Sequence, residues 1–356
     1  MEAAIGGGTK IDSPFGRRYI PPRVKPMAQI LAPQQSSQAT SRKSALLGVD
    51  LGSNHIRVGT VDQAGEVLAF RREPYSEQAR KNSRALADQI LSVSKQMMED
   101  QAATAPVSAV GAAFPGLVNQ ETRRVIEISQ LPSLAEIDLH REFTRAFGVS
   151  THFENNANAA AFAEMRAGAA RGVDDWLYLH IGANVSAGLV LNGRLRYGKS
   201  GLAGAIGNMN VYAEHPSSLM PLRSIASAES VVRRTRERLE KDRTSSLSKL
   251  GAMGGFTYDD IITQAHAGDD LARMMLSRTG TFIAMVLADV INLLNLAMIA
   301  IGGAPAARPF LAAAIAEGVR ERAFTAAISD CRVVAAELEV EASVIGAALL
   351  AAEYRR

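Results

Sequence analysis

The sequence predicts an α/β protein of two lobes, from its length, its strand pattern and one polar junction. With 356 residues, the chain has room for two domains of about 150 residues each. Short apolar runs typical of buried strands, at 46–49, 107–114 and 297–301, alternate with longer helical stretches. Between the two halves, three asparagines and a glutamate crowd into residues 154–158, where a strand is predicted to pass into a helix.

The composition is that of an ordinary globular protein, 47% hydrophobic and 21% charged. No apolar run approaches the ~20 residues that a membrane span needs, and the N-terminus lacks the apolar segment of a signal peptide. The single cysteine, Cys331, excludes an internal disulfide and a multi-cysteine zinc site within one chain. These features favour a cytoplasmic protein.

Residues 1–44 form a basic tail rich in Gly, Pro, Ser and Gln, without sustained helical periodicity. Seven Lys and Arg side chains against two acidic ones give the tail a net charge of +5, so the rest of a chain of total charge +3 carries −2. We expect a disordered tail, in which residues 17–23 are either a solvated linker or a patch for a protein partner. The slightly acidic remainder does not indicate a nucleic-acid surface.

The elements of an N-terminal lobe are predicted over residues 45–156. In chain order, we expect strands at 45–50, 56–60 and 66–71, a helix at 77–98, a strand at 107–114, a helix at 139–147 and a strand at 148–153. Asn155 or Asn156 then caps an alanine-rich helix, because asparagine is a good N-cap and alanine the best helix former.

A C-terminal lobe is predicted over residues 157–356. Its strands and helices are expected at 176–181, 189–191 and 194–197 (strands), 227–241, 258–266 and 270–296 (helices), 297–301 and 333–339 (strands), and from 343 onward (helix). The apolar helix at 281–296 is either core or an interface, with core favoured. An arrangement in which the last helix packs back on the N-terminal lobe stays open.

The polar junction is the first candidate site. Carboxamides at a helix start in a crevice can hydrogen-bond a polyhydroxyl ligand, but the same residues also suit a helix cap with no ligand. The stretch alone leaves both interpretations open.

The junction resembles the motif Glu-Asn-Asp-Ala-Asn-Ala-Ala-Ala of the ROK family, a family of sugar kinases and sugar-responsive repressors. Here it reads Glu154-Asn155-Asn156-Ala157-Asn158-Ala159-Ala160-Ala161, with Asn156 where the family has its catalytic aspartate. The resemblance extends over roughly residues 45–354. It implies an actin/hexokinase-like (ribonuclease H-like) fold, in which each lobe holds a mixed five-stranded sheet and the ligand cleft lies between the lobes.

Two segments resemble the family's phosphate loops. In the first, the resemblance implies that Asp50 holds Mg²⁺ through water and that the turn with Gly52 faces phosphate, but Ser53 and Asn54 replace a glycine and a threonine. In the second, Gly182 is kept and Ala183 replaces a threonine, so the hydroxyl for the γ-phosphate is missing.

Three further segments carry the remaining family features. The resemblance places Gly116 in a turn beside the sugar, and the Gly302-Gly303 turn where adenosine binds, although a tight strand-to-helix turn explains the same glycines. Asn208 stands where the family has a histidine that contacts sugar and zinc. No cysteine stands in residues 211–218, where the family's cysteine-rich zinc loop should follow, so we expect no zinc.

The resemblance therefore implies a substrate site of Glu154, Asn155, Asn156, Asn158, Asn208 and Gly116, with Mg·ATP as the cofactor of any kinase activity. Asparagine cannot take a proton at neutral pH, and we do not expect Glu154 or Glu164 to replace the base. The leading hypothesis is a kinase-like regulatory or scaffolding protein that senses a sugar without phosphotransfer. The alternatives are an ATP-dependent sugar kinase with unusual motifs and a structural interaction protein with an empty cleft.

The resemblance also bears on partners. Homodimerisation is expected from it alone. ROK repressors carry a winged helix-turn-helix before the core, which needs roughly 60–80 residues with helical periodicity. Residues 1–44 supply neither, so direct DNA binding by this chain is not expected.

Overall fold

The structure, a computed structural model, describes residues 44–102, 104–128, 131–213, 219–241 and 244–355. Nearly all of the predicted basic tail, with its proposed partner patch, lies outside the described residues, as does most of the segment after Asn208 where a zinc loop would stand.

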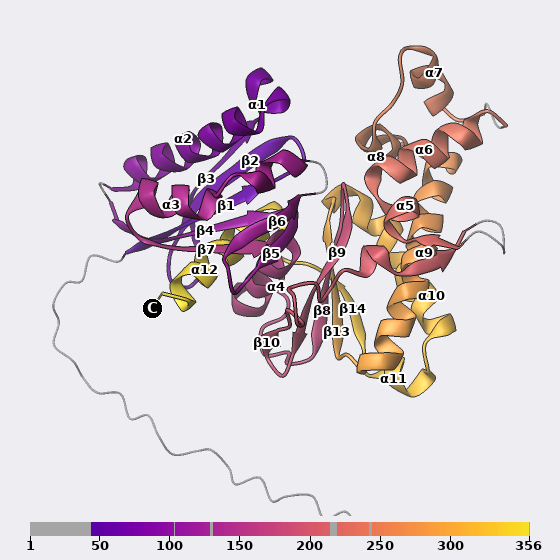
Figure 1. Cartoon of the computed structure of the whole chain (residues 1–356). Coiled ribbons are helices and arrows are strands. Elements are labelled where there is room, and N and C mark those ends of the chain that lie inside the picture. The colour runs from indigo at the N-terminus through magenta and orange to yellow at the C-terminus, as the bar shows by residue number, and fades with distance from the viewer. Residues whose placement is uncertain (1–43, 103, 129–130, 214–218, 242–243, 356) are drawn as a thin grey trace, which may run out of the picture. The chain divides into compact units, whose positions relative to one another are not determined.

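Two five-stranded mixed sheets confirm the predicted α/β architecture (Figure 1). The first has the strand order β3-β2-β1-β4-β7 and the second β10-β9-β8-β13-β14. Each begins with three antiparallel strands and continues with two strands parallel to the third. The first sheet consists of β1 (Ala45–Leu51), β2 (His55–Val61), β3 (Val67–Pro74), β4 (Val107–Phe114) and β7 (Ser150–Asn155). The second consists of β8 (Trp176–Ile181), β9 (Val185–Leu191), β10 (Arg194–Leu195), β13 (Met298–Gly303) and β14 (Arg332–Ala335).

Helices cover both sheets. Those that precede β8 in the chain are α1 (Glu77–Lys81), α2 (Ser83–Ala102), η1 (Pro132–Glu136), α3 (Leu139–Phe147) and α4 (Asn156–Ala167). Those that follow it are η2 (Ile206–Asn208), α5 (Arg223–Ala226), α6 (Ala228–Leu239), α7 (Leu247–Ala252), α8 (Tyr258–His266), α9 (Asp270–Leu294), η3 (Pro305–Ala307), α10 (Arg308–Arg322), α11 (Thr325–Ser329), η4 (Glu339–Glu341) and α12 (Ala342–Glu353). Two small hairpins, β5 (Gly116–Asn119) with β6 (Arg124–Ile128) and β11 (Asn210–Tyr212) with β12 (Leu219–Pro221), complete the fold.

Three predicted elements differ clearly from the structure. The strand expected at 333–339 is β14 at Arg332–Ala335, because pairing with β13 ends at Ala335, and residues 339–341 form η4 instead. The single helix expected at 77–98 is two helices, because Asn82 has an extended backbone and its side chain accepts hydrogen bonds from the amides of Arg84 and Ala85, which begins α2. Residues 185–188, expected in a loop, are the start of β9, where backbone pairing with β8 outweighs their small and polar side chains.

The last helix, α12, packs on β1 and β4 of the first sheet and on α4. Glycines allow this approach, because a Cβ on Gly48 would lie 2.0 Å from the Val344 carbonyl oxygen and one on Gly111 would lie 1.8 Å from that of Ala347. Helix α4 also packs on β8 and β9. The two helices thus lie face to face between the sheets, and the boundary drawn at residues 156/157 falls at the first residue of α4.

Helix α9 is long and apolar enough to cross a membrane by length and composition. In the structure 67% of its most apolar stretch is buried, and the helix packs against α10 within the larger hydrophobic core. The preference for a core helix over an interface is therefore confirmed.

Candidate functional site

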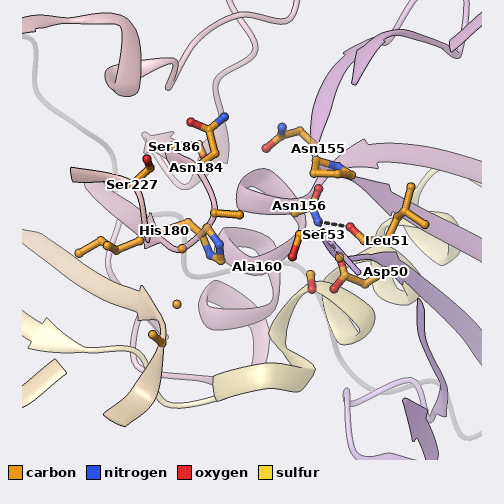
Figure 2. A pocket seen from close by; sticks show the side chains of 18 of the residues that line it. Asp50, Leu51, Ser53, Asn155, Asn156, Ala160, His180, Asn184, Ser186 and Ser227 are labelled. Atoms are coloured by element: carbon orange, nitrogen blue, oxygen red, sulfur yellow. Dashed lines mark hydrogen bonds between the residues drawn. The ribbon is translucent and has the colours of Figure 1, made fainter. Parts of the chain in front are cut away.

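A cavity of about 670 Å³ lies where the carboxyl ends of β1, β7, β8 and β13 meet, and its volume is in the range of small-molecule sites. The first sheet and α4 supply one wall, which includes Asp50, Ser53, Asn155 and Asn156 (Figure 2). The second sheet and α6 supply the facing wall, with His180, Asn184, Ser186 and Ser227. The third contribution comes from Glu339 and Val340 in η4 and from Ser343 in the first turn of α12.

Asn155 is the N-cap of α4. Its Oδ1 accepts hydrogen bonds from the amides of Ala157 at 2.8 Å and Asn158 at 3.4 Å, while its Nδ2 donates to the Gly116 carbonyl oxygen at 2.6 Å. The predicted cap is therefore confirmed. The same side chain also ties the β5–β6 hairpin to the start of α4, at the edge of the cavity.

Asn156, the first residue of α4, crosses to the first sheet. Its Nδ2 donates to Asp50 Oδ1 at 2.6 Å and to the Leu51 carbonyl oxygen at 3.1 Å (Figure 2). Both amide hydrogens are thereby used, which fixes the orientation of the carboxamide. Its Oδ1 is buried and has no hydrogen-bond partner among the described residues, so it presents an unsatisfied acceptor beside the cavity.

Asp50 is fully buried, and Arg57 from the adjacent strand forms an ion pair with its Oδ2. Asp50 and Arg57 are direct partners in the β1–β2 register, so strand pairing places the guanidinium there. Since Asn156 occupies Oδ1, both carboxylate oxygens already have a donor. Asp50 therefore has no carboxylate oxygen without a protein donor to offer directly to a Mg²⁺ ion.

The first predicted phosphate turn connects β1 and β2. The Gly52 amide donates to the His55 carbonyl oxygen at 2.9 Å, and the Tyr75 hydroxyl donates to the Gly52 carbonyl oxygen at 2.5 Å. Ser53 lines the cavity, whereas Asn54 is exposed and its Oδ1 hydrogen-bonds the ring of His55. The carboxamide of Asn54 therefore supports the turn from outside.

The second predicted turn, Gly182 to Asn184, connects β8 and β9. The Gly182 amide donates to the Asn184 carbonyl oxygen at 3.0 Å, and both Gly182 and Ala183 line the cavity. The His180 ring lies against this turn, because a Cβ on Gly182 would come within 2.9 Å of its Nε2. Burial lowers the pKa of His180, so the imidazole is neutral at neutral pH.

Two predicted ligand residues lie beneath the cavity wall instead of on it. Glu154 is 1% exposed and accepts hydrogen bonds from the Asn155 amide at 2.8 Å, Asn158 Nδ2 at 3.1 Å and Gln120 Nε2 at 3.2 Å. Asn158 is 3% exposed and faces this carboxylate. These residues hold the β5–β6 hairpin and the first turn of α4 in place.

The glycine pair at the end of β13 is required by packing. A Cβ on Gly302 would lie 2.0 Å from the Tyr178 hydroxyl oxygen. Gly303 has φ +95° and would place a Cβ 1.9 Å from the Ile181 carbonyl oxygen. Gly303 lines the cavity and Gly302 does not, while Gly116 and the exposed Asn208 also lie outside the lining.

Several cavity residues were missed by the sequence interpretation, above all His55, Arg57, His180 and Arg223. Burial and the nearby Arg57 and Arg72 lower the pKa of His55 to about 4. For His180, the sequence signal that could have indicated a site residue was a polar side chain near the end of an otherwise apolar strand. Arg57 gave a similar signal inside the alternating strand at 56–60.

A family model described as "ROK family" matches residues 46–354. Among curated proteins, the chain is similar to the glucokinase of Thermotoga maritima, with 28% identity over 319 residues that cover 87% of this chain and 98% of the relative. It is also similar to the DNA-binding transcriptional repressor Mlc of Escherichia coli, with 26% identity over 284 residues that cover 78% of this chain and 69% of the repressor.

Solved structures of both kinds share the fold. A ROK family transcriptional regulator, a homologue of the Escherichia coli Mlc protein, superposes with a TM-score of 0.75 at 25% identity and covers 87% of this chain and 78% of its own. A ROK family glucokinase from Streptomyces griseus, in complex with glucose and AMPPNP, gives a TM-score of 0.71 at 24% identity. The superposition covers 87% of this chain and 100% of the glucokinase chain.

Proposed function

The chain belongs to the ROK family, and on this premise we propose that it is a regulatory protein that binds a sugar or sugar-derived ligand in the cleft without transferring phosphate. The observation that carries the proposal is the state of Asn156. Its amide donates to Asp50 and to Leu51, and its buried Oδ1 is left as an acceptor beside the cavity. A ligand hydroxyl would satisfy that acceptor.

The same geometry argues against phosphotransfer. A carboxamide accepts a hydrogen bond from a hydroxyl but cannot remove its proton, and loss of a general base typically costs about 10²–10⁴-fold in rate. The nearby Glu154 is no substitute, because it is buried and its oxygens already accept hydrogen bonds from Asn155, Asn158 and Gln120.

Mg·ATP is also poorly served by the residues present. Phosphoryl transfer needs a metal ion and several donors around the phosphates. Asp50 is paired with Arg57 and Asn156, and the His180 ring lies against the Gly182 turn. Ala183 supplies no hydroxyl at that turn. We therefore propose that the departures from the family's phosphate motifs have removed nucleotide chemistry while the cleft itself was kept.

The ligand class follows from the polar groups and from the relatives. Asn155, Asn156, Asn184, Ser186 and Ser227 line the cavity with amides and hydroxyls, which suit a polyhydroxyl molecule. Structures with similar folds have been solved with glucose and with sucrose, and the relatives include xylose repressors. We propose a sugar in the same cleft here, without a preference among sugars.

Calorimetric titration of the full chain tests the proposal. D-glucose, D-xylose, sucrose and N-acetyl-D-mannosamine are titrated separately, and Mg·ATP is titrated alone and with each sugar present. We expect saturable heat with at least one sugar, none with Mg·ATP and no ADP formation in a coupled assay. If none of these compounds binds, the cleft has no ligand of this class. The third hypothesis, a structural interaction protein with an empty cleft, then replaces the proposal of a sugar-binding regulator.

An ATP-dependent sugar kinase is the second candidate, because two of the similar curated proteins are glucokinases and Asp50 is retained. Sugar-dependent ADP formation that disappears in Asn156→Ala would establish the kinase and refute the first proposal. ADP formation that survives this substitution would point to a contaminating enzyme.

The remaining expectations belong to the same proposal. We place the regulator in the cytoplasm, which agrees with a buried, unpaired Cys331. We propose a homodimer on family resemblance, with multi-angle light scattering as the check. A protein partner for the basic tail would be found as binding that is lost when residues 1–43 are deleted.

A further inference from the structure

The chain crosses between the two sheets at two places in the described residues. It leaves the first sheet from β7 through α4 and residues 168–175 to β8. It returns from β14 through residues 336–341, here called the return strap, to α12 on the first sheet. Any change in the cleft that moves one sheet relative to the other must act through these two connections.

Glu164 joins both connections through its side chain. It lies on α4 and is fully buried, with Oε1 accepting from the Glu337 amide at 2.9 Å and the Leu338 amide at 2.8 Å. Its Oε2 accepts from the Ala169 amide at 2.7 Å. One carboxylate thus holds the return strap and the segment after α4 with three backbone N–H groups.

The surroundings are built for this carboxylate. A Cβ on Gly168 would lie 2.1 Å from Glu164 Oε2, so that position has room only for glycine while the carboxylate is in place. Hydrogen bonds from N–H groups to an ionised acceptor are about twice as strong as neutral ones. Since Glu164 does not line the cavity, its role is not contact with a ligand.

The return strap forms part of the cavity wall directly after the segment that Glu164 holds. Glu339 and Val340 of the strap line the cavity, as does Ser343 in the first turn of α12. Glu339 has φ +47°, a left-handed conformation that is uncommon for residues other than glycine, and its Oε1 accepts from Arg308 Nη2 at 2.9 Å. The chain therefore changes direction one residue beyond the fixed Leu338 amide.

We propose that Glu164 is a positioning residue of the cleft, because its carboxylate fixes residues 337–338 to α4. The chain turns at Glu339, directly after this fixed point. The cavity wall at 339–343 is thereby held in place relative to Asn155 and Asn156. The proposal rests on the cleft as a ligand site and adds how its walls are held together. The first turn of α4 and the return strap then respond to a ligand as one unit.

Amide hydrogen exchange of the full chain, followed by mass spectrometry, tests this without any ligand. In the original chain, both oxygens of Glu164 accept hydrogen bonds from backbone N–H groups. In Glu164→Gln, the NH₂ group of the new amide replaces one of these oxygens, so a donor faces a donor. We expect exchange at residues 169 and 337–343 to accelerate about tenfold, with β1 and β13 unchanged. Glu353→Gln on α12 is the matched control, because it removes a solvent-exposed ion pair with Arg166, which lies on α4 like Glu164.

A second variant reports on the turn at Glu339 if Glu164→Gln fails to fold. Glu339→Gly relieves the left-handed strain, and we expect faster exchange at 339–343 with residues 337–338 still protected. Equal acceleration in all elements of Glu164→Gln, or none at 337–343, would overturn the proposal, as would loss of protection at 337–338 in Glu339→Gly. Absence of sugar binding would refute the proposed function and leave these exchange results unaffected.

Discussion

Asn156 Nδ2 lies 2.6 Å from Asp50 Oδ1, so an amide donor from α4 meets a buried carboxylate at the end of β1. The contact joins an element that packs on the second sheet to a strand of the first. A charge on Asn156 would change the electrostatics of this contact more than its shape, since aspartate and asparagine are nearly isosteric.

We expect Asn156→Asp to lower the free energy of unfolding at pH 8 by about 2 kcal/mol. The introduced carboxyl would replace an N–H donor with an acceptor beside Asp50, so its pKa in the folded state would be raised. Such a group costs stability as the pH rises above its unfolded pKa, and the loss should vanish near pH 4. Urea unfolding between pH 4 and pH 8 measures the difference.

Asn184→Asp is the control for that substitution. Asn184 also lines the cavity, but its Oδ1 accepts from the Val185 amide at 2.8 Å, and an aspartate would keep this bond. We expect less than half the pH-dependent loss of Asn156→Asp. An equal loss in both variants would show that the Asp50 contact is not the cause.

Removal of the guanidinium should be costly because it leaves a buried charge without its partner. We expect Arg57→Met to lower the free energy of unfolding by about 3 kcal/mol, the usual cost of breaking a buried pair from one side. The double variant Asp50→Asn with Arg57→Met should be more stable than Arg57→Met alone, because no unpaired charge remains. A double variant that loses the sum of both single effects would contradict this account.

Part of the site could be predicted from the sequence, because motif position is enough to place residues at strand ends. The residues that line the cavity include eight that the sequence predicted as site residues: Asp50, Gly52, Ser53, Asn155, Asn156, Gly182, Ala183 and Gly303. The direction in which each side chain points was harder to predict. Glu154 precedes Asn155 on the same strand and points to the other face, since strand side chains alternate. Asn158, two residues after Asn156 on a helix, is rotated by about 200° from it.

Residues on partner strands were missed for a different reason. Arg57 reaches Asp50 because the β1–β2 register pairs them, and His180 faces the cleft because β8 ends beside it. Spacing along the chain contains no register. The same limit explains β9, whose first residues read as a loop until their pairing with β8 is known. Elements with strong local signals, such as α3 with its Gly148 C-cap, begin and end where the sequence predicts.

His55 should make stability depend on pH in the acid range. Its pKa is lowered to about 4 by burial and by Arg57 and Arg72, so the unfolded chain binds the proton more readily than the folded one. Stability is therefore lost as the pH falls from about 6.5 toward 4. We expect His55→Gln to reduce the dependence of the urea midpoint on pH over this window. A slope in His55→Gln as steep as in the unsubstituted chain would assign the effect to other groups, such as the buried His180.

The contact between α4 and α12 should tolerate no additional atom. A Cβ on Gly346 would lie 1.7 Å from the Ala159 carbonyl oxygen, so Gly346→Ala must push the two helices apart at the point where the sheets are joined. We expect a loss of about 2–3 kcal/mol in the free energy of unfolding, as for other overpacked cores.

Gly251→Ala on α7 is the matched control, because nothing lies within 4 Å of its Cβ position, and replacing a helical glycine by alanine raises stability. Thermal unfolding of both variants gives the comparison. Equal melting temperatures would show that α4 and α12 can separate without cost, and the close helix contact would then not be what holds the two sheets together.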